Sequence, residues 1–163
     1  LVHHRQISGG KPVPILGCES SSFYVKADKN HLLAILGHLV QNAQDATDDD
    51  GKITISQKRS TEGVVIEIQD TGCGMDKAFI DNQLFKPFKT TKGSKGMGIG
   101  VYEARDYVHK LGGDIEVISR VGEGTTFRIR LPISDVGEND VKFSKATHDN
   151  NTDGRSYKEI TGH

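Results

Sequence analysis

The stretch QNAQDAT (41–47) decides the fold, together with three stretches that follow it along the chain. They are DTGCGM (70–75), LFKPFKTTKGSKGMGIG (84–100) and GEGTTF (122–127). The first lies on a predicted helix, the second at the end of a predicted strand, the third leads into another helix, and the last separates two strands. Their order is more informative than any one of them, because each marks a different element of the fold.

Three helices are predicted. Asp28 is a good N-cap for a helix over residues 29–47, a short helix is expected near 76–84, and a second long helix is expected over about 97–111. In the first helix, apolar residues recur at helical spacing and should face the core: Leu32, Leu36, Leu39 and Ala43.

Alternating apolar and polar residues predict strands at 23–27, 52–58, 64–70, 114–120 and 125–132. The last four form two hairpins, so neighbouring strands run antiparallel and are not joined by crossover helices. Because helices and hairpins segregate along the chain, the predicted fold class is α/β, a two-layer α/β sandwich with a mixed, mostly antiparallel sheet. A doubly wound parallel sheet is not expected.

Three regions are expected along the chain. Residues 1–22 form an irregular N-terminal arm with a short strand near 13–16, residues 23–133 form the domain, and residues 134–163 form a polar C-terminal tail.

The composition is that of an ordinary globular domain, with 163 residues of which 34% are hydrophobic and 26% charged. The 21 basic and 22 acidic residues nearly balance, so no nucleic-acid partner is expected. No apolar run approaches the ~18 residues that a membrane-spanning helix needs. Cys18 and Cys73 lack the spacing of a zinc site and are expected to be free thiols.

On the first predicted helix, His38, Asn42 and Asp45 share one stripe beside the apolar one. An Asn amide oxygen is a neutral, hard ligand that suits Mg²⁺ carried by a nucleotide, and Mg²⁺ takes few protein ligands. The alternative is the solvated polar face of an amphipathic helix.

Asp70 ends a predicted strand and is followed by Gly72 and Gly74. Its carboxylate can accept a hydrogen bond from the exocyclic amine of adenine, and the glycines let the backbone approach a flat base. The alternative is a turn that ends a strand. Thr125, in the turn before the last predicted strand, is expected to approach the same base through its hydroxyl.

The run KGMGIG (95–100) places three glycines at the entry to the second long helix, where backbone N–H groups and the helix dipole attract phosphate. It fits neither the dinucleotide fingerprint nor the P-loop. At least one of three preceding lysines is expected to reach a phosphate oxygen, with Lys92 first; the others are Lys89 and Lys95. A solvated flexible loop is the alternative. Phe85 and Phe88 are expected to anchor one end of this loop or to dock onto a partner domain.

Together the stretches resemble the asparagine, first glycine, phenylalanine and second glycine boxes of sensor histidine kinases, followed by a terminal glycine–threonine turn. The resemblance covers about residues 23–132 and implies the Bergerat ATP-binding fold, which gyrase and MutL-type ATPases share. It also implies ATP and Mg²⁺ bound between the two long helices, under a lid. The segment 90–92 is similar to nitrogen-regulator-type kinases, and GHLVQNAQDAT (37–47) suggests the sensor kinases of PEP-CTERM/exosortase systems.

The resemblance assigns roles to individual residues. Asn42 would ligate Mg²⁺, and Asn42, His38 and Lys92 would take part in catalysis. Asp70 would bind the adenine. The implied cofactor-binding residues are Asn42, Asp45, Asp70, Gly72, Gly74, Lys92, Gly96, Met97, Gly98, Gly100 and Thr125.

Two positions depart from the family pattern. His38 stands where many histidine kinases carry Asn and where hydrolytic relatives carry a Glu that activates water. Its imidazole is a metal neighbour, a phosphate contact or a packed helix residue. Asp45 stands where other subgroups carry a Lys or Arg that contacts the terminal phosphate. An anionic side chain must act there through water on Mg²⁺, or cap the helix end.

The implied function is ATP-dependent phosphorylation of a histidine on a dimerisation domain that lies upstream in the family. His3 and His4 lie too close to the domain to be that acceptor. The implied partners are the phosphoacceptor domain, a response regulator and a second copy of a full-length protein anchored in the bacterial inner membrane, with this domain in the cytoplasm. A gyrase- or MutL-like ATP hydrolase and a non-catalytic nucleotide sensor stay open as alternatives.

Overall fold

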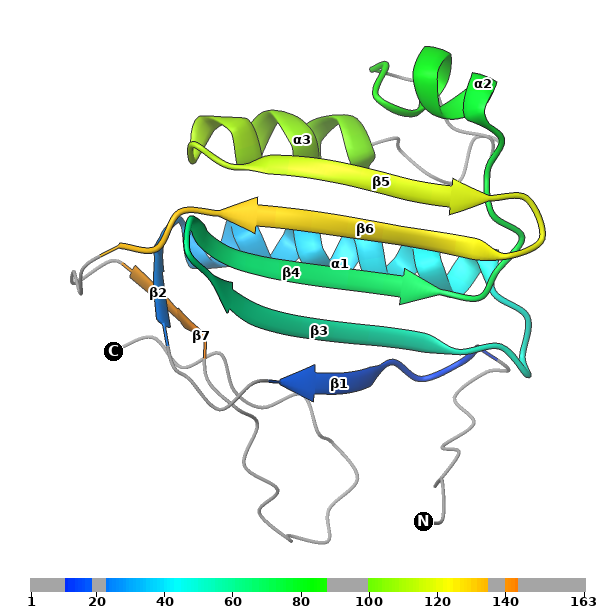
Figure 1. Ribbon diagram of the computed structural model, residues 1–163, viewed down its shortest axis with the longest axis horizontal. Coiled ribbons are helices and arrows are strands. Elements are labelled where there is room, and N and C mark those ends of the chain that lie inside the picture. The colour runs from blue at the N-terminus through cyan, green and yellow to red at the C-terminus, as the bar shows by residue number, and fades with distance from the viewer. Residues whose placement is uncertain (1–10, 19–22, 88–99, 135–139, 144–163) are drawn as a thin grey trace, which may run out of the picture.

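The computed structural model describes residues 11–18, 23–87, 100–134 and 140–143. Its main layer is a five-stranded sheet in the order β1-β3-β4-β6-β5 (Figure 1). β1 pairs with β3 in parallel, and the other neighbouring strands are antiparallel. The predicted mixed, mostly antiparallel sheet is therefore confirmed. The strands are Ile15–Cys18 (β1), Ile53–Ser60 (β3), Gly63–Asp70 (β4), Asp114–Arg120 (β5) and Gly124–Leu131 (β6).

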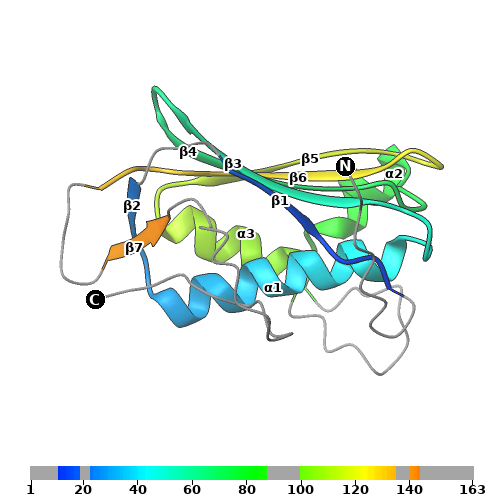
Figure 2. The same ribbon diagram turned by 90° about the horizontal axis from the view of Figure 1, so that it is seen from below.

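Two long helices, α1 (Lys29–Ala46) and α3 (Val101–Lys110), cover one face of this sheet (Figure 2). A short helix α2 (Lys77–Phe79) continues into a π-helical turn, η1 (Ile80–Leu84). The second layer consists of α1 and α3, so the predicted two-layer α/β sandwich is confirmed. No helix in the described part of the chain is long and apolar enough to cross a membrane.

Helix α1 forms as the sequence predicts. The Asp28 side chain accepts a hydrogen bond from the His31 N–H at 2.7 Å, which satisfies one of the free donors of the first turn. The apolar stripe faces the sheet and buries Leu32, Ile35, Leu39 and Ala43. Burial of this stripe against β4 and β6 fixes α1 on the sheet. It thereby also fixes the position of the neighbouring polar stripe of the helix, which carries His38, Asn42 and Asp45.

One strand lies where the sequence did not predict regular structure. β7 (Asp140–Phe143) forms within the segment expected to be a polar tail, and it pairs antiparallel with β2 (Phe23–Lys26) in a separate two-stranded sheet. The rings of Phe23 and Phe143 stack with their centres 5.2 Å apart. The expected tail is thus wrong at these four residues, because a four-residue alternation in polar surroundings is a weak signal. β1, in the expected N-terminal arm, overlaps the short strand predicted near 13–16 and pairs with β3 in the main sheet.

Helix α3 begins later than predicted. Gly100 is its N-cap, with φ −135° and ψ −109°, so the helical residues start at Val101. The earlier part of the predicted helix, 97–99, lies outside the described residues. Gly112, which follows the helix, has φ +79°, the left-handed conformation that commonly ends helices.

Replacing Gly37 by Ala is expected to stabilise the fold. Gly37 lies in the middle of α1, and a Cβ atom there would meet nothing within 4 Å. Ala restricts the unfolded chain and favours the helix, so we expect the free energy of unfolding to rise by about 0.5–1 kcal/mol. Urea denaturation measures the change. Gly113→Ala is the matched control and should destabilise, because its Cβ would overlap the Arg130 carbonyl oxygen. A Gly37→Ala variant no more stable than the wild type would contradict the prediction.

Candidate functional site

Asp70 lies at the carboxyl end of β4, where the sheet meets the C-terminal end of α1, and only 3% of its surface is exposed. Its Oδ1 accepts hydrogen bonds from the Gly72 N–H at 2.8 Å and from the Thr125 N–H at 3.2 Å. Thr125 is its partner in the β4–β6 register. Both hydrogen bonds that the described residues donate to the Asp70 side chain end on Oδ1. Among the residues that the structure describes, no hydrogen bond ends on Oδ2, which can accept a further donor.

Burial raises the pKa of the Asp70 carboxyl above its ordinary value of 3.8, and the two backbone hydrogen bonds oppose that rise. Asp70 then binds a proton more readily in the folded chain than in the unfolded chain. Its contribution to stability is complete below the unfolded-state pKa and is lost as the pH rises through the folded-state pKa.

We therefore expect the free energy of unfolding of the wild type to fall, relative to that of Asp70→Asn, as the pH rises from the unfolded-state pKa of Asp70 through its folded-state pKa. The Asn variant has no titrating group at this position, so the difference between the two proteins isolates the carboxyl. Urea denaturation of both at a series of pH values from about 3.5 to 7 measures it. A difference that moves in favour of the wild type as the pH rises would contradict the sign of the pKa shift.

The glycines beside Asp70 pack closely against the backbone of the chain itself. A Cβ at Gly72 would overlap the Ala46 carbonyl oxygen, and one at Gly74, where φ is +66°, would overlap the Arg120 carbonyl oxygen. The Cys73 N–H donates to the Ala46 oxygen at 2.9 Å. These glycines let the loop pack against the backbone of α1 and of the β5–β6 turn. They position Asp70 through the protein's own packing, and nothing in that packing requires a flat ligand.

A second layer of hydrogen bonds lies behind Asp70. Ser119 Oγ accepts from the Met75 N–H at 2.8 Å, donates to the Gly124 carbonyl at 2.9 Å and lies 2.8 Å from Thr125 Oγ1. The Thr125 hydroxyl, which is expected to approach the base, lies beside Ser119 in the structure. The sequence analysis did not single out Ser119. The alternation of Ile115, Val117 and Ser119 on β5 could have placed it on the inner face of the sheet.

Asn42 lies close to the N-terminus of α3. It is half-buried, and a Cβ built on Gly100 would lie 3.8 Å from Asn42 Nδ2. The first turn of α3 has unpaired N–H groups and the positive end of the helix dipole. Two predicted site residues from distant parts of the chain are thus brought together, and the junction of α1 with α3 suits an anion.

The other two residues of the predicted stripe differ in their surroundings. His38 is exposed, so the interpretation of a packed helix residue is wrong. Asp45 forms an ion pair with Lys11 and accepts a hydrogen bond from Gln41 Nε2 at 2.9 Å. The sequence analysis did not predict a role for Lys11, and no local pattern could have done so because its partner lies 34 positions away.

Four predicted site residues lie outside the described residues, and the structure does not test them: Lys92, Gly96, Met97 and Gly98. Phe85, before this segment, is half-buried, and the Arg105 guanidinium carbon lies 4.4 Å from the centre of its ring. This contact joins the chain before the segment to α3, which follows it. It agrees with the expected anchoring role of Phe85, while Phe88 also lies outside the described residues.

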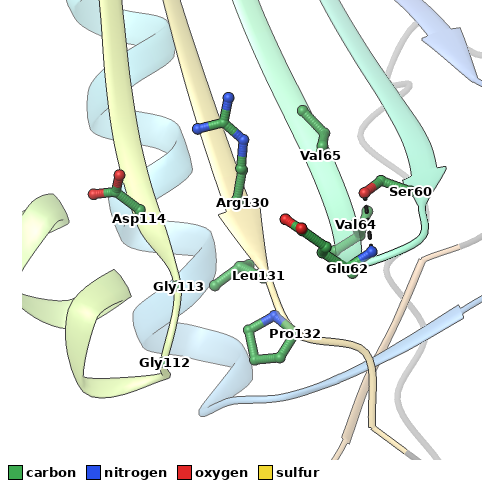
Figure 3. Close-up of a pocket in the computed structure, with 11 residues that line it drawn as sticks. Ser60, Glu62, Val64, Val65, Gly112, Gly113, Asp114, Arg130, Leu131 and Pro132 are labelled. Carbon is green, nitrogen blue, oxygen red and sulfur yellow. Dashed lines mark hydrogen bonds between the residues drawn. The ribbon is translucent and has the colours of Figure 1, made fainter.

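An open pocket of about 230 Å³ lies at the other end of the sheet (Figure 3). Its walls come from the start of β4, the start of β5 and the end of β6, and they include Val65, Asp114 and Arg130. Asp70 and Thr125 occupy the opposite ends of β4 and β6. Arg130 pairs with Glu116 at 2.7 Å, and Asp114 pairs with His109 at 3.0 Å. The pocket is therefore separate from the predicted site.

The sequence matches the family described as histidine kinase-, DNA gyrase B-, and HSP90-like ATPase over residues 27–135. The chain belongs to this family. The match spans both long helices and the strands β3, β4, β5 and β6, so the predicted Bergerat-type ATP-binding domain is confirmed. The narrower resemblance to PEP-CTERM sensor kinases stays a prediction.

Similar proteins of this ATPase family are sensor histidine kinases. The chain is 34% identical to sensor histidine kinase ZraS of Escherichia coli K12 over 110 residues, which are 68% of this chain and 23% of that protein. It is 36% identical over 118 residues to histidine-protein kinase AtoS of the same organism, covering 72% of this chain and 19% of that protein. The chain therefore spans about a quarter or less of the length of these relatives.

The fold also matches solved structures of the family. The catalytic domain of histidine kinase ThkA, in a nucleotide-free form, superposes with a TM-score of 0.64 at 26% identity, covering 73% of this chain and 77% of that one. Full-length ShkA in complex with AMPPNP superposes with a TM-score of 0.65 at 23% identity, covering 76% of this chain and 26% of that one. At that identity, the second likeness concerns the fold alone.

Proposed function

We propose that this domain binds Mg-ATP and transfers the γ-phosphoryl group to a histidine on a separate dimerisation domain of a sensor histidine kinase. The family and the sensor kinases among its relatives support the class of reaction. The single observation that carries the proposal is the geometry of Asp70. Both of its backbone donors bind Oδ1, and Oδ2 is left for a ligand at the end of the sheet.

Asp70 selects the base in this proposal. Its Oδ2 accepts a hydrogen bond from the exocyclic amine of adenine, whereas guanine presents a carbonyl oxygen at the same position. Because Asp70 is buried, a carboxylate oxygen without a donor is costly, and this increases the preference for adenine over guanine. The Gly72 and Thr125 N–H groups hold the carboxylate in place, and Ser119 holds the β5–β6 turn behind them.

The phosphate groups lie at the junction of α1 and α3. N–H groups in the first turn of α3 donate to phosphate oxygens, and Asn42 supplies an amide oxygen ligand for Mg²⁺. The fit of Asn42 rests on its donor chemistry and its place beside Gly100. The bound metal neutralises charge on the phosphates, and the domain aligns the γ-phosphoryl group with an acceptor that it does not itself contain.

The full-length protein is proposed to be a homodimer that is anchored in the bacterial inner membrane and passes its phosphoryl group to a response regulator. The base that takes the acceptor proton belongs to the dimerisation domain. His3 and His4 are not proposed as acceptors and lie outside the described residues. The isolated domain should therefore bind nucleotide and turn over slowly.

The test is a transfer assay with γ-labelled ATP, this domain and the dimerisation domain of the same full-length protein. We expect acid-labile label on the dimerisation domain, and no label when its histidine is replaced by Ala. Bound nucleotide without transfer would contradict the kinase proposal. Multiple turnover without any acceptor would instead favour an ATP hydrolase, which His38 in place of a Glu argues against.

A further inference from the structure

The segment before β1 contacts the last turns of α1. The Lys11 ammonium pairs with the Asp45 carboxylate, and Gln44 Nε2 donates to the Pro12 carbonyl at 3.2 Å. Gln41 Nε2 also donates to Asp45 at 2.9 Å. A side-chain ion pair and a backbone contact therefore hold this segment beside the same helix that carries Asn42 (Figure 2).

Asp45 lies three residues after Asn42, on the same stripe of α1. A carboxylate at this position, next to the negative end of the helix dipole, repels a triphosphate that is bound at Asn42. The described part of the chain supplies a compensating cation in Lys11, whose side chain remains 48% exposed. An ammonium group has three donors, so one that is paired with Asp45 can still donate to a phosphate oxygen.

We propose that Lys11 is a phosphate-binding residue of the nucleotide site and that Asp45 is the residue that positions it. This inference rests on the proposed function. It gives the segment before β1 a part in binding nucleotide. It also gives Asp45 a role, although its negative charge repels that of the ligand. The rival explanation is that the ion pair only fastens the segment to α1.

The two explanations differ in how the effect depends on the number of phosphate groups. Lys11→Ala removes the ammonium group and keeps the Asp45 carboxylate near the phosphates. Titration calorimetry of the 163-residue chain with AMP, ADP and ATP, each with Mg²⁺, should show the largest loss for ATP, about tenfold, and the smallest for AMP. The double variant Lys11→Ala/Asp45→Ala has the net charge of the wild type and lacks the repelling carboxylate. It should still bind ATP more weakly than the wild type, because the contact between the ammonium group and phosphate is lost, whereas an ion pair that only holds the segment on α1 predicts wild-type ATP affinity.

The matched control is Lys110→Ala, which breaks an exposed Lys–Asp pair of 2.6 Å at the far end of α3 and changes the net charge equally. It should leave all three affinities unchanged. Equal losses for AMP, ADP and ATP in Lys11→Ala, or no loss, would overturn the inference and leave the proposed function intact. A wild-type chain that binds none of the three nucleotides would overturn the proposed function itself.

Discussion

Asp70→Asn is expected to weaken ATP binding roughly tenfold or more and to abolish the preference for ATP over GTP. The buried N–H groups of Gly72 and Thr125 need an acceptor, so the Asn amide oxygen takes the place of Oδ1. The amide nitrogen then takes the place of Oδ2 and directs a donor at the donor amine of adenine. The same nitrogen is complementary to the carbonyl oxygen of guanine, so GTP should gain affinity while ATP loses it.

Calorimetric titration of wild type and Asp70→Asn with ATP and GTP measures both affinities. Asp114→Asn is the matched control, because it replaces a carboxylate at the far end of the sheet, beside the pocket of Figure 3. This control should leave the ratio of ATP affinity to GTP affinity unchanged. If Asp70→Asn keeps the wild-type ratio of affinities, Asp70 does not recognise the base.

Asn42→Ala should abolish most of the Mg²⁺-dependent part of the ATP affinity. Asn42 is the proposed protein ligand of a metal that keeps its other positions for water and phosphate. Loss of an interaction with a charged group costs about 1.5–3 kcal/mol, or roughly 10- to 100-fold in affinity. The affinity measured without Mg²⁺ should change little, because the base contact at Asp70 is intact.

The measurement is the ratio of ATP affinities with and without Mg²⁺ in the wild type and the variant. Asn82→Ala is the control, since Asn82 is an exposed residue of η1 whose side chain donates to the Ala78 carbonyl at 3.0 Å. If Asn42→Ala keeps the wild-type Mg²⁺ dependence, the metal ligand lies elsewhere in the chain.

The regular elements of the domain could be predicted because their signals are local. The cap at Asp28 and the stripe that includes Leu32 and Leu39 specify α1, and alternation of apolar and polar residues indicates the two hairpins. β7 escaped prediction because its four residues are stabilised by pairing with β2, from the other end of the chain. Its strand is fixed by burial of Val141 and Phe143, at 2% and 6% exposure, and not by propensity.

The sequence predicts the residue types of the candidate site but not the contacts that support them. Asp70 and Asn42 could be named because an acid at a strand end and an amide on a polar stripe have specific chemistry. The positions of Gly72 and Ser119 depend on how the loop packs against α1 and the β5–β6 turn. No local sequence pattern predicts these tertiary contacts. The pairing of Lys11 with Asp45 is a tertiary contact of the same kind.

The most direct test of the account is a crystal structure of the domain with Mg²⁺ and a non-hydrolysable ATP analogue. The account predicts the exocyclic amine of adenine about 3 Å from Asp70 Oδ2, and the phosphates between Asn42 and the first turn of α3. An analogue bound in the pocket beside Arg130, or an adenine amine turned away from Asp70, would contradict it.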